Sequence, residues 1–580
     1  MTMRYVTTTI AALLLLAAPA FAQHHGRYGV TGMAPTYSPC QPHEDPFDIK
    51  PGVHLPVTAT PAVQNLINQG LTLFYSFNYD HAFIKFVKAT QLDGGNVAMA
   101  HWGVALAAGS NINIGMDDIC RSRAISAITR AGELAERQHG TRSITEPEYQ
   151  YIQALKPRYL GTIKANIPLE AEYKVAMDRL IALYPDDPNA LTLYADSVME
   201  LRAWGLYDVA SRPAIGTEPM VAQLERGIRA DARHLGANHY YIHAVEPSLT
   251  PERARTAADI LPSLFPEGGH IQHMPGHIYM RQGLYPKVIE ANLAAIAADK
   301  RYLAFCEGGG GQSNPKCLGL YTGHYLSHNY LFLIAGYTML GQAADAITNA
   351  DALRSLSQAF VGNQPGLERY MTASIFTRAT FQRWQELRQQ PKPPEKNRLA
   401  TGVWHWGQGM AFAALGNVTQ AEDQYTTLTQ IIGDVSGYTW GNNGAGSLMR
   451  IAQQTLGARM ATTRGQLPAA IENLKVATTL EDGLIYDEPP PWMYPARQSL
   501  GGALLAAKRY AEAETYFRED LGKERYPDNG RSNYGLAISL KCQGKPGWQE
   551  YMDRYKARWK GAPLTVGDLW SPLAEACAKE

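Results

Sequence analysis

The stretch GLTLFYSFNYDHAFIKF, from Gly70 to Phe86, decides the fold. Its apolar residues recur three and four positions apart on both sides of Asn78, which is the spacing of two amphipathic helices joined by a short break. The second half carries an aromatic residue four positions after an alanine, at Ala82 and Phe86. Small residues at such positions allow two helices to cross closely. The stretch therefore predicts a pair of packed helices.

The same pattern returns far along the chain. ALGNVTQAEDQY places Tyr425 four residues after Ala421, and AKRYAEAETYF places Phe517 four residues after Ala513. This arrangement resembles the tetratricopeptide repeat, whose second helix carries Ala-x3-Phe. The resemblance implies an all-α solenoid of stacked helix pairs, in which the first helix of each pair lines the concave face of a superhelix.

Length and composition set the expected division of the chain. A chain of 580 residues exceeds one compact core, and an elongated repeat array is one way to use such a length. We expect two helical halves joined by the proline-rich stretch QQPKPPEK. The expected parts are a signal peptide (1–22), an irregular arm (23–60), an N-terminal array with a histidine cluster (61–388), a linker (389–396), a C-terminal array (397–560) and a tail (561–580).

The N-terminus MTMRYVTTTIAALLLLAAPAFAQ predicts export to the periplasm or the cell exterior. One arginine precedes an apolar run that closes on Ala-Phe-Ala, the pattern of a secretory signal peptide cut after Ala22. No later apolar run is long enough to span a bilayer, so we expect no membrane insertion. Basic and acidic residues number 53 each, which leaves no basic field to attract nucleic acid.

Six cysteines follow the predicted cleavage point, and the expected compartment permits disulfides. Cys306 and Cys317 bound the loop CEGGGGQSNPKC, and their short separation favours a disulfide between them. The other four can pair in three ways, and the sequence does not choose among them: Cys40, Cys120, Cys542 and Cys577.

Three consecutive helix pairs each carry His-x3-His in the first helix, within GANHYYIHAVEP, HIQHMPGHIYMRQG and YTGHYLSHNYLF. Residues four apart share one face of a helix, so two imidazoles can converge on one metal ion. Equivalent helices of a repeat stack lie side by side, so we expect all three pairs to face one cavity. The predicted metal ligands are His239, His243, His273, His277, His324 and His328, with His270 as a further candidate.

Pro275 modifies the geometry of the middle pair. Proline is unfavourable inside a helix but fits its first turn. We therefore expect His273 to precede the helix and His277 to lie in its first turn. His270 either reaches the site or caps the preceding break, and the sequence leaves both open.

The ligand types point to copper. Imidazoles with few carboxylates argue against magnesium and calcium, and they suit copper, zinc, iron or nickel. A blue-copper site lacks its thiolate here, and the zinc-peptidase pattern His-Glu-x-x-His is absent from the sequence. Six or seven histidines exceed the four ligands of one structural zinc. Two ions with three histidines each resemble, in ligand type only, the dicopper centres of phenol oxidases and oxygen carriers.

We therefore favour a copper-dependent oxidase or oxygenase that holds a small-molecule or peptide substrate in its concave groove. One alternative is a zinc-dependent hydrolase in which Glu246, one turn after His243, is the catalytic base. Glu246 can also be a ligand, or an acceptor behind an imidazole. The non-enzyme alternatives are a peptide-binding scaffold and a periplasmic copper carrier.

Other aromatic and polar residues are expected to be structural. His101 and His405 each stand alone beside a tryptophan. The segment YDEPPPWMYP, from Tyr486 to Pro495, is held extended by its prolines, and packing is a better explanation for it than lining a pocket. Most of the tyrosines beside the histidines are expected to pack, namely Tyr240, Tyr241, Tyr279 and Tyr325.

The stretches GANHYYIHAVE and HMPGHIYMRQG, with AHWGVAL near residue 101, resemble an exported and poorly characterised subgroup of tetratricopeptide repeat proteins. The resemblance covers most of the mature chain. It implies the helical-repeat fold and places the histidine stretches among the subgroup's features, but it implies no activity.

Overall fold

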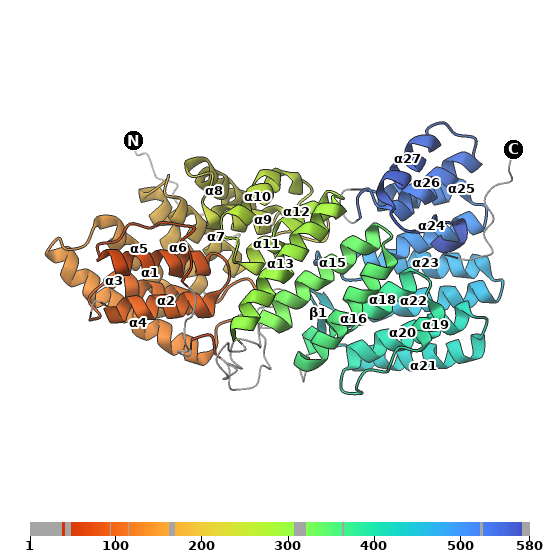
Figure 1. Cartoon of the computed structure of the whole chain (residues 1–580), viewed down its shortest axis with the longest axis horizontal. Coiled ribbons are helices and arrows are strands. Elements are labelled where there is room, and N and C mark those ends of the chain that lie inside the picture. The colour runs from red at the N-terminus through yellow and green to blue at the C-terminus, as the bar shows by residue number, and fades with distance from the viewer. Residues whose placement is uncertain are drawn as a thin grey trace, which may run out of the picture.

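The computed structural model shows an elongated array of helices (Figure 1). It describes residues 38–40, 48–92, 94–113, 115–161, 169–306, 321–361, 365–522 and 526–570. The predicted signal peptide and the predicted partner Cys317 of Cys306 lie outside these residues. The described parts of the arm, residues 38–40 and 48–60, contain no helix or strand.

The helices follow one another along the array from one end to the other (Figure 1). The first end is built from α1 (Pro61–Phe74), α2 (Tyr79–Leu92), α3 (Ala98–Ala107), α4 (Asp118–Gly140), α5 (Glu146–Leu160), α6 (Leu169–Leu183), α7 (Pro188–Leu201) and α8 (Thr217–Ala230). The middle holds α9 (Leu235–Val245), η1 (Pro251–Ala254), α10 (Arg255–Ile260), η2 (Leu261–Ser263), α11 (Gly269–His273), α12 (Pro275–Arg281), α13 (Tyr285–Cys306), the π-helix η3 (Tyr321–Leu326), α15 (Ser327–Met339) and α16 (Ala343–Phe360).

The other end begins with short helices and one small hairpin and continues with long helix pairs. Its elements are η4 (Pro365–Leu367), α17 (Glu368–Met371), α18 (Ala373–Thr380), α19 (Trp384–Arg388), α20 (Arg398–Ala414), α21 (Val418–Asp434), β1 (Thr439–Trp440), β2 (Asn443–Gly444), α22 (Ala445–Thr463), α23 (Leu467–Asp482), α24 (Ala496–Ala506), α25 (Tyr510–Asp520), α26 (Gly530–Cys542), α27 (Trp548–Arg558) and α28 (Val566–Leu569). The two strands pair antiparallel.

Short turns with helix-capping residues make the pairs. Between α20 and α21 the chain reverses over three residues, where Gly416 takes a left-handed φ of 87°. The side chain of Asn417 then accepts the backbone N–H of Gln420 and caps α21. Connections this short leave successive helices antiparallel and in contact. The pairs α1 and α2, α20 and α21, and α22 and α23 all pack in this way.

In two of the predicted pairs the aromatic residue, Phe86 or Phe517, packs against glycines of two neighbouring helices. A Cβ added to Gly70 of α1 or to Gly103 of α3 would lie 2.7 Å or 2.1 Å from the ring of Phe86. The rings of Phe86 and Phe517 are both fully buried. Phe517 of α25 stands in the same relation to α24 and α26, since Cβ atoms at Gly501 and Gly535 would lie 2.5 Å and 2.3 Å from it. The chain is an all-α, tetratricopeptide-like helix-pair solenoid, as predicted.

This contact predicts a stability difference between two glycine substitutions. Gly103→Ala places a methyl group inside the Phe86 ring, and overpacking of this kind costs about 1–3 kcal/mol of unfolding free energy. In the control Gly132→Ala, within α4, the nearest atom is Lys156 Cε at an ordinary 3.6 Å. That substitution is expected to be neutral or to stabilise by about 1 kcal/mol. Thermal unfolding of both variants tests the difference, and equal melting temperatures would contradict it.

The buried residues form two large hydrophobic cores. One runs from Cys40 to Ala373 and includes Tyr526, and the other runs from Ile375 to Trp570. The segment 389–396, predicted as a linker, joins α19 to α20 within the second core. Trp570, inside the predicted tail, is fully buried in that core.

One disulfide joins Cys40, which precedes α1, to Cys120 in α4. Cys542 is also disulfide-bonded. The Cys40 pairing is one of the three that the sequence allows for the four cysteines outside the 306–317 loop. Among the described residues, none of the helices combines the length and the apolar character that a bilayer crossing requires.

Candidate metal centre

Six of the seven predicted histidine ligands meet in the middle of the array. Helix α9 supplies His239 and His243, and the short helices α11 and α12 supply His270, His273 and His277. His328 comes from α15. Five of the six are almost inaccessible to solvent, with exposed fractions of 0–4%. The predicted convergence of three helix pairs therefore takes place inside the protein, and these five imidazoles do not line an open groove.

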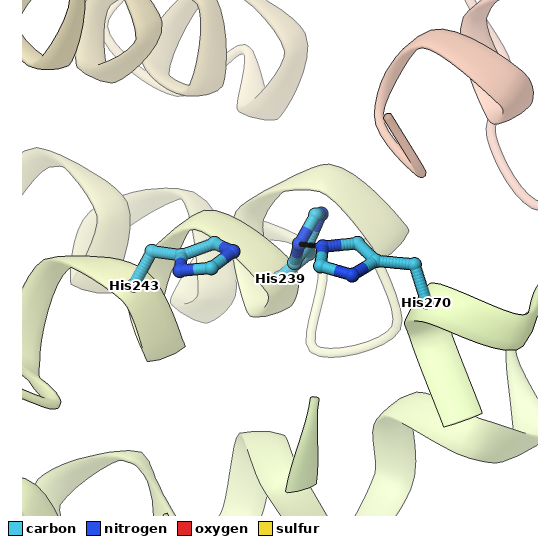
Figure 2. A group of neighbouring side chains, drawn as sticks. All are labelled: His239, His243 and His270. Carbon is cyan, nitrogen blue, oxygen red and sulfur yellow. Dashed lines mark hydrogen bonds between the residues drawn. The ribbon is translucent and has the colours of Figure 1, made fainter. Parts of the chain in front are cut away.

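The first histidine group consists of His239, His243 and His270. Each offers one ring nitrogen, and the three nitrogens lie within 4.8 Å of one another. Figure 2 shows the three rings turned toward a common point, with two contributed by α9 and one by α11. Nε2 of His239 is 3.1 Å from Nε2 of His270. His270 thus reaches the site, which resolves the alternative that the sequence left open.

Buried acceptors fix the tautomers of two rings in this group. Nδ1 of His239 lies 2.6 Å from the carbonyl oxygen of Tyr75, which can only accept, so this nitrogen carries the proton. Nδ1 of His243 donates in the same way to Oε1 of Glu246 at 2.9 Å. In neutral rings both Nε2 atoms therefore carry no proton and each has a free lone pair. Nε2 of His243 has no hydrogen-bond partner among the described residues. This is the tautomer and support that metal-binding imidazoles use.

The second histidine group consists of His273, His277 and His328, again with one nitrogen each within 4.8 Å of one another. Nε2 of His273 lies 2.7 Å from Nε2 of His277. Nδ1 of His273 is 2.7 Å from Oδ1 of Asn292, and the amide nitrogen of Asn292 donates to the Val288 carbonyl. Asn292 therefore presents an acceptor, and Nε2 of His273 is a bare lone pair in the neutral ring.

The contacts of His277 require a proton or a metal ion at its Nε2. Its Nδ1 contacts two carboxylates, Glu246 Oε2 at 2.8 Å and Glu488 Oε2, and so carries a proton. A neutral His277 would then point a bare Nε2 at the bare Nε2 of His273, which is repulsive. Either a second proton or a metal ion removes this repulsion. In the metal-free chain burial lowers the pKa of His277, but Glu246 and Glu488 outweigh burial and raise it to about 10.

The other histidines of both groups are held neutral. Burial, reinforced by the charge of His277, lowers the pKa of His243 to about 3 despite the opposing charge of Glu488. Burial and neighbouring imidazoles also hold the pKa values of the remaining four well below 6.5, namely His239, His270, His273 and His328. Neutral imidazoles are the form that binds metal.

Glu246 contacts one histidine of each group at its Nδ1. It caps the C-terminus of α9 and is fully buried, with one oxygen on Nδ1 of His243 and the other 2.8 Å from Nδ1 of His277. Among the roles predicted for Glu246, the acceptor behind an imidazole is the one that this geometry matches. Both oxygens thus lie within 2.9 Å of a histidine nitrogen.

Glu488 is a site residue that the sequence patterns did not single out. It is 5% exposed and lies in the proline-rich segment between α23 and α24, more than 200 residues from His277. With Glu246 and His277 it forms a third group of closely spaced ligand atoms. The only sequence signal was the unusual run of prolines that follows it.

Each histidine group packs against one phenylalanine. The ring of Phe77, between α1 and α2, lies 5.3 Å from the ring of His270 and 5.6 Å from that of His243, nearly parallel to both. Phe77 has a left-handed φ of 60°, which is strained for a bulky residue. Phe332 of α15 lies within 4.7–5.0 Å of all three rings of the second group. These rings shield the imidazoles from water.

The turn around Pro275 matches its prediction in part. Pro275 opens α12, and His277 lies in the first turn of that helix, as expected. His273 precedes this helix but closes the separate helix α11. His270 and His273 both lie in α11, three residues apart, yet His270 belongs to the first group and His273 to the second.

Several predicted residues remain outside both groups. His324, within the π-helix η3, lies 6.3 Å from His328 between ring centroids and belongs to neither group. His101 contacts the carbonyl of Gly95, and His405 contacts Gln424. The hydroxyls of three of the tyrosines bind carboxylates away from the histidines, namely Tyr240 with Asp196, Tyr241 with Glu225 and Tyr279 with Asp259. The ring of Tyr325 packs on His270.

A pocket of about 80 Å³ leads to the second group. Its lining includes His277 and Phe332 but none of the first group's histidines. The segment from Leu484 to Trp492 forms much of its wall, so part of the proline-rich stretch lines a pocket, which was the less favoured of the two expectations.

Comparison with known proteins adds only fold-level likeness. No family model matches the chain, and no curated protein matches it. Among solved structures, the human IFIT1 dimer with m7Gppp-AAAA is 12% identical, with 86% of this chain and 90% of that chain covered and a TM-score of 0.32. Yeast Tom70 is 13% identical, with 83% and 96% covered and a TM-score of 0.26.

Proposed function

We propose that this chain binds two metal ions, each through three buried histidines, and that it is a copper-dependent oxidase or oxygenase. The observation that carries the proposal is the pair of histidine groups, in which ring nitrogens converge within 4.8 Å. Buried acceptors hold the opposite nitrogens of His239, His243 and His273 protonated. Such support behind the ligands is what a metal site needs and what simple packing does not require.

Copper at such a centre would supply dioxygen binding and electron transfer. The ligand set contains only imidazoles, which suits copper or zinc, and the signal-peptide pattern favours an exported, oxidising setting. The chain's own residues hold every imidazole of the two groups except His277 neutral, orient three of them through Tyr75, Glu246 and Asn292, and pack Phe77 and Phe332 against the rings.

For a zinc-dependent hydrolase, Glu488 is a better candidate for the catalytic base than Glu246. Both oxygens of Glu246 lie within 2.9 Å of a histidine nitrogen, and Glu246 does not line the pocket, whereas Glu488 does and its Oε1 has no hydrogen-bond partner among the described residues. A copper carrier would use the same ligands without turnover. The peptide-binding scaffold is favoured by the helix-pair solenoid itself, although the imidazoles are too deeply buried to contact a peptide.

Metal content separates these functions. We expect protein purified without a histidine tag to contain about two equivalents of copper by mass spectrometry, and the double variant His243→Ala/His277→Ala to lose both, because one ligand leaves each group. The control His405→Ala removes a histidine remote from both groups and should keep the metal.

Each other outcome favours one alternative. Zinc in place of copper selects the hydrolase. Copper without oxygen uptake on any reducing substrate selects the carrier. Absence of metal even after reconstitution with copper and zinc would overturn the metal centre and leave the scaffold.

A further inference from the structure

The lining of the pocket beside the second histidine group includes an acceptor and a donor that have no hydrogen-bond partner among the described residues, Oε1 of Glu488 and Nε1 of Trp492. Glu488 is 5% exposed and lines the pocket, and its Oε1 has no hydrogen-bond partner among the described residues. Leaving a buried carboxylate oxygen unpaired is unfavourable. A ligand that donates a hydrogen bond at this point removes this penalty.

The other acidic residues of the pocket are already engaged. Asp487 contacts Arg369 and accepts the backbone N–H of Asn442, and Asp208 pairs with Arg212. Glu481 accepts the backbone N–H of Ala496 at the start of α24. The pocket thus combines an available acceptor at Glu488 with carboxylates that outnumber its lining cations, Arg281 and His277. The excess of carboxylates disfavours an anionic ligand, and Oε1 of Glu488 favours a ligand that donates a hydrogen bond.

Besides Ser211, Arg281 and Tyr486, the remaining walls are mainly apolar and partly aromatic. They come from α12, α15 and the proline-rich segment, and their side chains are Met280, Phe332, Leu484, Pro489, Pro490, Pro491 and Trp492. The volume of about 80 Å³ is far below the roughly 300–1,000 Å³ of pockets for drug-sized ligands. A single ring that projects toward solvent is the largest group that fits.

We infer that this pocket binds a small, uncharged, ring-containing molecule through one hydroxyl group, which donates to Oε1 of Glu488. Such a ligand lies against His277 and Phe332 and so meets the second histidine group alone. The first group lies behind Phe77 and does not line the pocket. The inference deepens the proposed oxidase function by naming its substrate class. The binding step needs no metal, so its test can fail independently of that function.

Calorimetry on the metal-free protein tests the inference with three probes of similar size. We expect phenol to bind at one site, toluene to bind at least about tenfold more weakly because it lacks the donor, and benzoate not to bind because it is an anion. Equal affinities of phenol and toluene, tighter binding of benzoate, or no saturable binding of phenol would each overturn the inference.

Two variants test whether the hydroxyl of phenol binds at Glu488. Glu488→Leu removes the acceptor and should weaken phenol at least about tenfold while toluene changes little. The control Asp208→Asn removes a carboxylate at the same pocket, one already paired with Arg212, and should leave phenol binding unchanged. An unchanged phenol affinity in Glu488→Leu would contradict the assignment. If Glu488→Leu fails to fold, the comparison of the three probes on the unaltered protein still decides.

Discussion

Glu246→Gln should weaken binding at both histidine groups, although this residue belongs to neither. A glutamine has one oxygen and one NH2, whereas Glu246 presents oxygens to Nδ1 of His243 and to Nδ1 of His277. The NH2 must therefore face a ring N–H, and one imidazole must change its tautomer or turn away. Loss of a single partner behind a ligand costs about 10–100-fold in metal affinity. Because Glu246 supports one ligand of each group, we expect about 100-fold.

Competition with a chelator of known affinity measures this effect. The matched control is Glu225→Gln in α8. This carboxylate accepts a hydrogen bond from the hydroxyl of Tyr241, which lies on α9 with His239 and His243, but it belongs to neither histidine group. The control should keep its affinity within about threefold of the unaltered protein, the scatter expected of substitutions outside the site. If Glu246→Gln also keeps it, Glu246 does not position the ligands. A variant that loses affinity for only one equivalent of metal would show that it supports a single group.

The fold was predictable because its signal is local. Ala82 and Phe86, like Ala513 and Phe517, sit four apart on one helix, and each aromatic ring needs a glycine on the helices beside it. Such constraints repeat along the sequence and can be read without knowing the tertiary structure. The same reasoning identified His239, His243, His273, His277 and His328, since equivalent positions of a stack lie side by side.

The rest of the site depends on contacts between distant segments. Glu488 contacts His277 from the segment between α23 and α24, and no spacing in the sequence links the two. Tyr75 supports His239 through a backbone carbonyl, which any residue type could offer. The grouping of the histidines was also hidden, because His270 and His273 share the short helix α11 and still belong to different groups. His324 is four residues from His328, but it lies in a π-helix and takes no part.

The metal-free protein should lose stability steeply as the pH falls below 6.5. Burial lowers the pKa of His234 to about 4 and that of His243 to about 3, from 6.5 in the unfolded chain. Between those values the unfolded chain binds protons that the folded chain does not. Stability is therefore fully present above pH 6.5 and falls by about 1.4 kcal/mol per pH unit for each such histidine.

Buried carboxylates oppose this loss over part of the range. Burial raises the pKa of Glu368 to about 7 and, together with Glu246, raises that of Glu488 to about 7. From pH 7 down to 4.5 the folded chain binds protons at these carboxylates before the unfolded chain does, which stabilises it. Below pH 4.5 the unfolded carboxylates are protonated too, so this compensation stops growing. His277 adds no slope here, since its contribution is complete below pH 6.5 and is lost only as the pH rises toward 10.

Two variants outside the histidine groups separate these effects. His234→Asn keeps an N-cap for α9, where the ring now accepts the backbone N–H of Ala237, but it cannot titrate. Between pH 6 and 4 its stability should fall less steeply by about 1.4 kcal/mol per pH unit. Glu368→Gln keeps an acceptor for the N–H of Ala400 and should fall more steeply between pH 7 and 4.5. Urea unfolding with a chelator present, at half-unit pH steps, measures both slopes. Parallel curves for all three proteins would show that these groups titrate alike in the folded and unfolded chains. Such a result would remove the electrostatic basis for neutral, metal-ready imidazoles in this part of the array.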